Sequence, residues 1–125
     1  MMAFDFSDLF VLDLANNHQG NLEHGKRVVL EHSRVVKAAG VRAAIKFQFR
    51  DLDTFIHSSA LQGHSNPHIA RFLGTKLEPG DYADLLSTVR GEGLLSMCTP
   101  FDEISVKRVV QMGFDIIKVA SASAR

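Results

Sequence analysis

Apolar and polar positions follow two different periods along the chain. Four short apolar runs have the length of buried strands, and they lie at residues 10–15, 43–49, 94–98 and 114–120. Three segments between the runs place apolar residues at helical spacing, and they cover residues 22–39, 82–89 and 104–112. Strands and helices therefore alternate, which predicts an α/β fold of right-handed βαβ units around a parallel sheet.

The expected ends of the helices carry suitable polar and glycine residues. Asn21 and Asp102 precede the first and last helices as candidate N-caps. The three helices then end near Gly40, Gly93 and Gly113, and each glycine leads almost directly into the next apolar run. The same type of helix-to-strand connection is thus expected three times.

Residues 51–76 are less regular and are interpreted as a long loop, with one or two helical turns around residues 67–72. Loops of this length in compact domains are usually functional or mobile. The loop contains His57, His64 and His68, but no cysteine or carboxylate accompanies them at a zinc-site spacing, so we do not expect a zinc site.

The run Ile45–Phe49 is the most informative stretch of the chain. Residues two apart on a strand share a face, so Lys46 and Gln48 point together, opposite to Ile45, Phe47 and Phe49. A buried ammonium group is costly unless it meets an anion. The alternative is an edge-strand lysine that protects against aggregation.

A second lysine occupies a similar place in the repeat, because Lys46 and Lys118 both lie near the carboxyl end of a predicted strand. That end carries the chemistry in parallel α/β folds. Other polar groups expected there are Asp13, the loop of residues 16–20, Thr99 and Ser121. This convergence predicts an anion site for phosphate or carboxylate. The alternative is that one lysine is exposed and the other pairs with Asp13.

Composition narrows the class of protein. The 125 residues are enough for one domain, and 46% hydrophobic and 22% charged residues are typical of a globular chain. A formal net charge of zero gives no sign of a basic surface that would bind nucleic acid, and no apolar run reaches the length of a membrane span. Residues 1–8 lack the basic residues of a secretory signal, and the single Cys98 fits a reducing compartment, so we expect a cytoplasmic protein.

Four motifs together resemble the sialic acid synthase family. Leu12–Gly20 (LDLANNHQG) is similar to its A-E-I-G-x-N-H-x-G opening, and Lys46–Gln48 (KFQ) to its K-F-Q strand. Ser96–Asp102 (SMCTPFD) resembles its S-T-P-F-D turn, and Ile117–Ser121 (IKVAS) its K-I-x-S strand. The motifs occur in the family's order and at fitting spacing over nearly the whole chain.

The resemblance implies a (β/α)8 (TIM) barrel that condenses phosphoenolpyruvate with N-acetylmannosamine or a related amino sugar, releasing phosphate. Residues 1–9 would be an N-terminal extension and residues 10–125 the N-terminal half of the barrel. The second half, an antifreeze-like domain and two histidine ligands of a divalent metal (Mn or Mg) are expected outside this chain. The family also implies a homodimer, in which the antifreeze-like domain reaches the partner's site.

The resemblance also implies roles for individual residues. Lys46, Lys118 and Ser121 match phosphoenolpyruvate-binding positions, Gln48 a residue near the sugar, and Asp13 the active-site glutamate. Asp13, Lys46 and Gln48 are therefore the expected catalytic residues. Further residues expected to bind substrate are Asn17, His18 and Thr99. For His18, lining the pocket through hydrogen bonds is favoured over ligating a metal.

Three departures from the family pattern indicate a divergent branch. The glutamate is the shorter Asp13, the motif's glycine is Ala15, and the usual Gly-Glu pair after the fourth strand is Ala122-Ser123. A carboxylate set back by one methylene alters its reach. Altered sugar specificity or altered chemistry is therefore expected.

Two other functions stay open. Strand lysines in barrels also form Schiff bases with carbonyl substrates, as in aldolases. Alternatively, the chain is a non-catalytic half-barrel whose open first and fourth strands pair with another copy, giving a homodimer or larger assembly. Cys98 is interpreted as a core thiol, because no base beside it is indicated.

Overall fold

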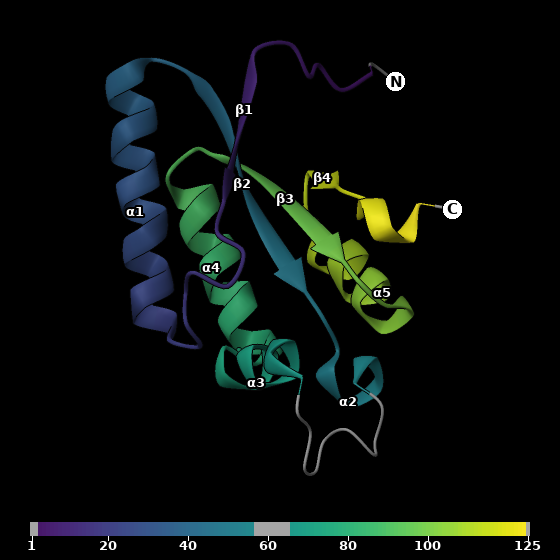
Figure 1. Cartoon of the computed structure of the whole chain (residues 1–125). Helices are drawn as coiled ribbons and strands as arrows, with labels where there is room; N and C mark the ends of the chain where they lie inside the picture. The colour runs from purple at the N-terminus through teal and green to yellow at the C-terminus, as the bar shows by residue number, and fades with distance from the viewer. Residues whose placement is uncertain (1–2, 57–65, 125) are drawn as a thin grey trace.

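The computed structural model describes residues 3–56 and 66–124. Its centre is one four-stranded parallel sheet in the order β1-β2-β3-β4 (Figure 1). The strands are β1 (Leu9–Asp13), β2 (Arg42–Phe49), β3 (Leu95–Pro100) and β4 (Ile116–Ile117). The helices between them are α1 (Leu22–Ala39), α2 (Leu52–Phe55), α3 (Pro67–Gly74), α4 (Pro79–Gly91) and α5 (Glu103–Met112). The predicted alternation and parallel sheet are confirmed.

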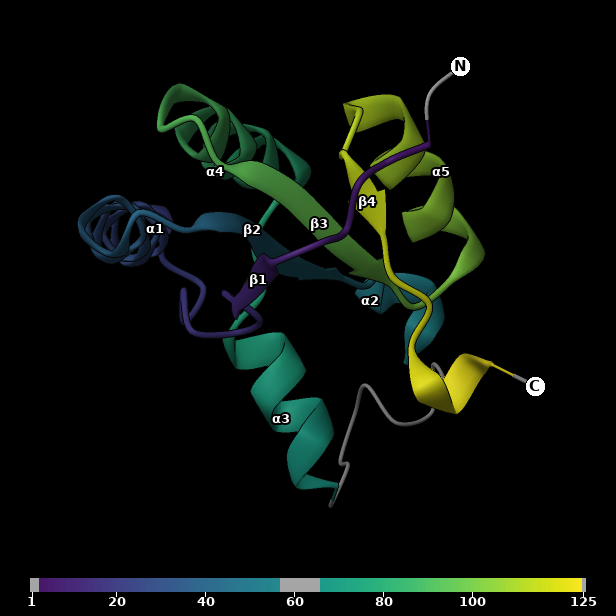
Figure 2. The ribbon, with the colours of Figure 1, turned by 90° about the horizontal axis from the view of Figure 1, so that it is seen from above.

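Helices α1, α4 and α5 lie on one side of the sheet, as the view from above shows (Figure 2). The side chains of Ile45, Phe47 and Phe49 point toward this side and are at most 2% exposed. They form the main core together with residues of α1, α4 and α5. The predicted alternation of β2 is therefore confirmed.

Helix α1 packs closely against its neighbours. A Cβ added at Gly25 would lie 3.0 Å from the Leu85 side chain of α4 and 3.1 Å from the Cβ of His18 in the loop between β1 and α1.

The opposite side of the sheet carries a smaller apolar cluster of Ala44, Met97 and Ile116, with Leu9 and Leu95 against it. The strand register places Lys46 beside Asp13 on one neighbour and beside Met97 on the other. This side of the sheet, opposite α1, α4 and α5, is thus apolar near the amino ends of the strands and polar near their carboxyl ends.

Helix ends follow the predicted chemistry. The side chains of Asn21 and Asp102 accept hydrogen bonds from the backbone N–H groups of His24 and Ser105. Gly40 and Gly113 cap α1 and α5 in the left-handed region, at φ values of 64° and 76°. The same residue chemistry therefore sets where each helix meets the sheet.

Two expected boundaries were wrong. The fourth strand was expected over residues 114–120 but covers only Ile116–Ile117. At its start, the side chain of Asp115 accepts from both the backbone N–H (2.9 Å) and the hydroxyl (3.0 Å) of Ser96, so a side chain replaces backbone pairing there. At its end, the Lys118 N–H still donates to the Cys98 carbonyl at 2.9 Å. Thr99 and Pro100 were expected in a turn but extend β3 beside Gln48 and Phe49.

The irregular stretch after β2 holds more helix than expected. Helix α3 (Pro67–Gly74) begins at Asn66, whose side chain accepts from the His68 N–H, and it confirms the expected helical turns. Helix α2 was not foreseen. His57 and His64 lie outside the described residues, and His68 contacts Arg71 at 3.3 Å.

The segment before β1 packs back onto β2. Arg42 donates to the Asp5 carbonyl at 2.7 Å, and its guanidinium lies 5.3 Å from the Phe4 ring centre.

Within residues 3–56 and 66–124, no helix is long and apolar enough to cross a membrane.

Candidate functional site

An open concavity of about 560 Å³ lies on the side of the sheet opposite α1, α4 and α5. Its polar lining consists of Asp13, Lys46 and Lys118, and its apolar lining includes Met97 and Ile116. The three polar residues come from β1, from β2 and from the position directly after β4. The structure therefore brings together both lysines and the carboxylate that the sequence indicated.

Lys46 and Asp13 form an ion pair, with 3.0 Å between Nζ and Oδ1. The Lys46 side chain is only 15% exposed, whereas that of Asp13 is 55% exposed. A mostly desolvated ammonium group gains from a nearby anion. Without a ligand, Asp13 supplies that anion, and an anionic ligand at this place would contact Lys46 in its stead or beside it.

Lys118 is placed by the backbone of the neighbouring strand. Its N–H donates to the Cys98 carbonyl at 2.9 Å, which holds the residue in line with β4 although the strand itself has ended. Its side chain is exposed at the concavity. The structure thus shows the alternative of one paired and one exposed lysine, and it leaves Lys118 accessible to an anion.

The other predicted site residues lie outside the lining of the concavity. Thr99 is 3% exposed beside Gln48 in the sheet, and Asn17 reaches the Asp13 carbonyl with its amide at 3.5 Å. Ser121 begins a short 3-10 helix (Ser121–Ser123) and is exposed, but it does not line the concavity. Thr99, Asn17 and Gln48 do not line the concavity either; Gln48 lies two residues beyond Lys46 on β2, and Thr99 is its neighbour on β3.

His18 is buried rather than exposed to the concavity. It is 1% exposed, its Nδ1 accepts from the Gly20 N–H at 3.0 Å, and its ring meets Tyr82 edge-on with 6.2 Å between centres. Burial lowers the pKa of His18 below its ordinary value. A neutral imidazole that shapes the β1–α1 loop fits these contacts, and the predicted binding role is not tested by them.

A small polar hollow lies at the carboxyl end of β2, and sequence reasoning missed most of its lining. It holds about 20 Å³, roughly the space of one water molecule. Gln48 and the loop that contains Asn16 were predicted, but Arg50, Lys76 and Tyr82 were not. For Arg50 a signal existed, because it follows β2 directly and continues the alternation of Lys46 and Gln48.

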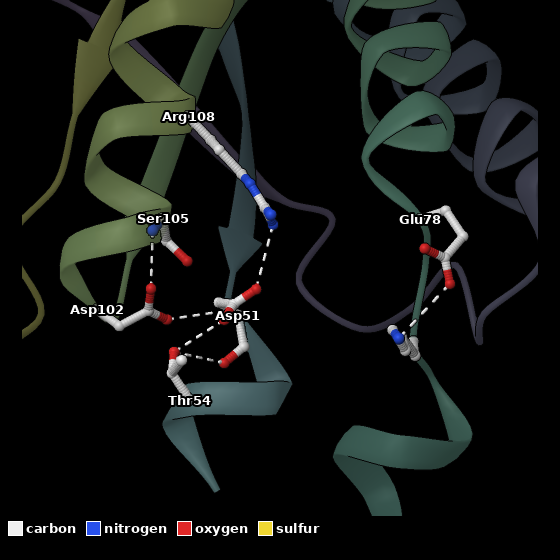
Figure 3. A network of polar contacts seen from close by, with 7 residues as sticks. Asp51, Thr54, Glu78, Asp102, Ser105 and Arg108 are labelled. Carbon is white, nitrogen blue, oxygen red and sulfur yellow. Dashed lines mark hydrogen bonds and ion pairs between the residues drawn. The ribbon is translucent and has the colours of Figure 1, made fainter.

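The ends of β2 and β3 are joined by a network around two aspartates (Figure 3). Asp102 accepts from the Asp51 N–H at 2.8 Å with one oxygen, and from the Ser105 N–H at 2.7 Å with the other. Arg108 of α5 in turn contacts the Asp51 carboxylate at 3.3 Å. The aspartate of the predicted turn motif therefore fixes the rim of the site and is not itself placed in the concavity.

Cys98 is fully buried in β3, and burial raises its pKa to about 12. Because the thiolate is the nucleophilic form, this thiol is inert at neutral pH. The interpretation of Cys98 as a core thiol agrees with its place in the main apolar cluster.

Comparison with known protein families decides the affiliation. The sequence pattern of the NeuB family matches residues 34–125, which is most of the chain. The chain belongs to the NeuB family. This confirms the resemblance to sialic acid synthases that the four motifs indicated.

Solved structures agree with the NeuB assignment. A protein assigned as spore coat polysaccharide biosynthesis protein E from Chromobacterium violaceum shares 38% identity with the chain at a TM-score of 0.88. The N-acetylneuraminic acid synthetase from Leptospira borgpetersenii, solved with citrate, shares 21% at 0.69. Spore coat polysaccharide biosynthesis protein spsE from Bacillus subtilis shares 17% at 0.60. No curated protein sequence matches the chain.

The aligned regions define which part of the NeuB fold is present. They cover 94%, 92% and 96% of this chain but 35%, 36% and 34% of the three solved proteins, in the same order. The chain thus spans about a third of their length. Its four βα units correspond to the first four strands of the (β/α)8 barrel, as the sequence predicted.

The NeuB resemblance implies a divalent metal. In residues 3–56 and 66–124, no three His, Cys, Asp or Glu side chains gather as a metal site. The described residues by themselves do not fit such an ion, and its two histidine ligands are expected outside this chain.

Proposed function

We propose that the chain provides the phosphoenolpyruvate-binding part of a sugar-acid synthase. The observation that carries this proposal is the placement of Lys46 and Lys118, from two different strands, on one concavity at the carboxyl ends of the sheet. Family membership supports the same class of enzyme. The second substrate would be N-acetylmannosamine or a related amino sugar.

Lys46 and Lys118 would bind the phosphate and carboxylate of phosphoenolpyruvate. Two ammonium groups at one open surface complement a small trianionic ligand, and charge-assisted hydrogen bonds are the strong ones. The backbone N–H of Lys118 is already used by Cys98, so only its side chain is left to contact the ligand. By the family resemblance, Ser121 would add a hydroxyl donor from outside the concavity, whereas Thr99 is buried in the sheet.

The proposed reaction forms one carbon–carbon bond. The methylene carbon of phosphoenolpyruvate attacks the aldehyde carbon of the open-chain sugar, and the aldehyde oxygen takes up a proton. Water adds to the former enol carbon, and the bond between this carbon and the phosphate oxygen then breaks. The products are a nonulosonic acid and inorganic phosphate.

Asp13 would act once the substrate anion displaces the Asp13 carboxylate from Lys46. The carboxylate is then released from the 3.0 Å ion pair, while it stays on the same side of the sheet. From there it would orient a sugar hydroxyl or transfer a proton. Gln48, two residues beyond Lys46 on the same face, would contact the sugar.

The Schiff-base alternative has less support from the geometry. A lysine that condenses with a carbonyl must present a neutral amine. Lys46 instead lies in an ion pair with Asp13. Borohydride trapping with pyruvate separates the two: a stable adduct on Lys46 or Lys118 favours the aldolase.

The test of the proposed function is release of phosphate from phosphoenolpyruvate by the protein as encoded by its gene. Phosphate is expected only when N-acetylmannosamine or another amino sugar is present, with formation of the nonulosonic acid seen by mass spectrometry. Release that is independent of every amino sugar offered, or no release with any of them, would contradict the proposal.

A further inference from the structure

The guanidinium of Arg50 lies close to two aromatic rings. Its central carbon is 4.3 Å from the ring centre of Phe72 and 3.8 Å from that of Phe101. Phe72 belongs to α3 and Phe101 follows β3, so the two rings come from segments that are distant in sequence. Both rings lie within cation–π distance of the guanidinium, and its planar edge can still donate hydrogen bonds.

That edge meets Gln48. The Arg50 Nη1 donates to the Gln48 Oε1 at 3.2 Å. Arginine has no acceptor, so the side-chain amide of Gln48 must present its carbonyl oxygen to Arg50. The amide nitrogen of Gln48 consequently points away from Arg50 and is the donor offered to a ligand.

The backbone of Gln48 is held from the other side of the sheet. The Tyr82 hydroxyl donates to the Gln48 carbonyl at 3.3 Å. Burial raises the pKa of Tyr82 to about 12, so the hydroxyl keeps its proton at neutral pH. Gln48 is thus fixed at its main chain by α4 and at its side chain by Arg50.

We propose that Arg50 is a positioning residue that sets the orientation of the Gln48 amide toward the sugar substrate. The Phe72 and Phe101 rings fix the guanidinium, the guanidinium fixes the amide oxygen, and the amide nitrogen then donates to a hydroxyl or carbonyl oxygen of the sugar. This inference rests on the proposed function, because it needs a sugar beside Gln48.

Direct anion binding by Arg50 is the competing role. Arg50 and Lys76 line the same small hollow, and in this competing role the two cations would together bind the phosphate or carboxylate of the substrate. The two roles differ in which substrate binds more weakly when Arg50 is replaced. A positioning role concerns the sugar, whereas direct anion binding concerns phosphoenolpyruvate.

The test uses the protein as encoded by its gene, with the variants Arg50→Lys, Gln48→Ala and the double variant. Lysine keeps the charge but cannot stack on the rings or donate from a planar edge. For Arg50→Lys we expect about a tenfold rise in KM for the sugar, the value of one hydrogen bond, with KM for phosphoenolpyruvate changed less than about twofold. Arg27→Lys, an exposed change on α1, is the matched control and should change neither.

The double variant decides whether Arg50 acts through Gln48. If it does, Arg50→Lys adds nothing once Gln48 is alanine, because residues that act as one unit are not additive. Additive losses, or a rise in KM for phosphoenolpyruvate equal to that for the sugar, would overturn the inference while leaving the synthase function intact. A wild-type protein without sugar-dependent phosphate release would instead refute the proposed function, and this inference with it.

Discussion

Asp102 is expected to contribute more to stability than an ordinary helix cap. One carboxylate oxygen caps α5 through the Ser105 N–H, and the other accepts from the Asp51 N–H at the end of β2. Loss of an N-cap costs about 1 kcal/mol. Leaving the part-buried Asp51 N–H without its acceptor costs about 1–3 kcal/mol more. Asp102→Ala should therefore lower the free energy of unfolding by about 2–4 kcal/mol.

The matched control is Asn21→Ala, because Asn21 caps α1 through the His24 N–H at 2.9 Å. Its loss should cost only about 1 kcal/mol. Asp102→Asn keeps the cap but turns an amide N–H toward the Asp51 N–H when its oxygen faces Ser105, so we expect an intermediate loss. Urea unfolding followed by circular dichroism measures all three. An Asp102→Ala loss no larger than that of Asn21→Ala would refute the tie between the two strands.

Two further stability predictions come from the β1–α1 loop. Ala15 stands where the family motif has glycine yet keeps a φ of 44°, so Ala15→Gly should raise the free energy of unfolding by about 1 kcal/mol, and an unchanged or lower urea midpoint would contradict this. Burial lowers the pKa of His18 from 6.5, so the folded state disfavours its protonation. Its contribution is fully present above pH 6.5 and is lost as pH falls toward the lowered value. Between pH 7.5 and 5.5, His18→Gln should therefore lose less stability than the wild type in urea unfolding; an equal loss would rule His18 out as the cause.

The fold was predictable where local chemistry and global arrangement agree. The glycines at the ends of α1 and α5 and the caps at Asn21 and Asp102 act within one or two turns of the chain, so their residue types suffice. The face of Lys46 followed from strand alternation in the same way. By contrast, β4 begins late because Asp115 binds Ser96, a contact between residues 19 positions apart that no local pattern encodes.

The candidate site was predictable in its charges and not in its supporting contacts. Lys46, Lys118 and Asp13 follow from their positions at strand ends, and the structure places them on one concavity. The aromatic contacts of Arg50 depend on Phe72 of α3 and Phe101 after β3, which meet only in three dimensions. His18 belongs to a polar motif, but its burial against Tyr82 depends on the packing of α4.

The most direct test of the anion site is a calorimetric titration of phosphoenolpyruvate into the protein as encoded by its gene. Lys46→Ala and Lys118→Ala should each weaken binding by about tenfold or more, because each removes one charge-assisted contact. Lys107→Ala, an exposed lysine of α5 away from the concavity, is the matched control and should leave the Kd unchanged. Absence of binding to the wild type, or binding that Lys46→Ala leaves unchanged, would contradict the proposed site.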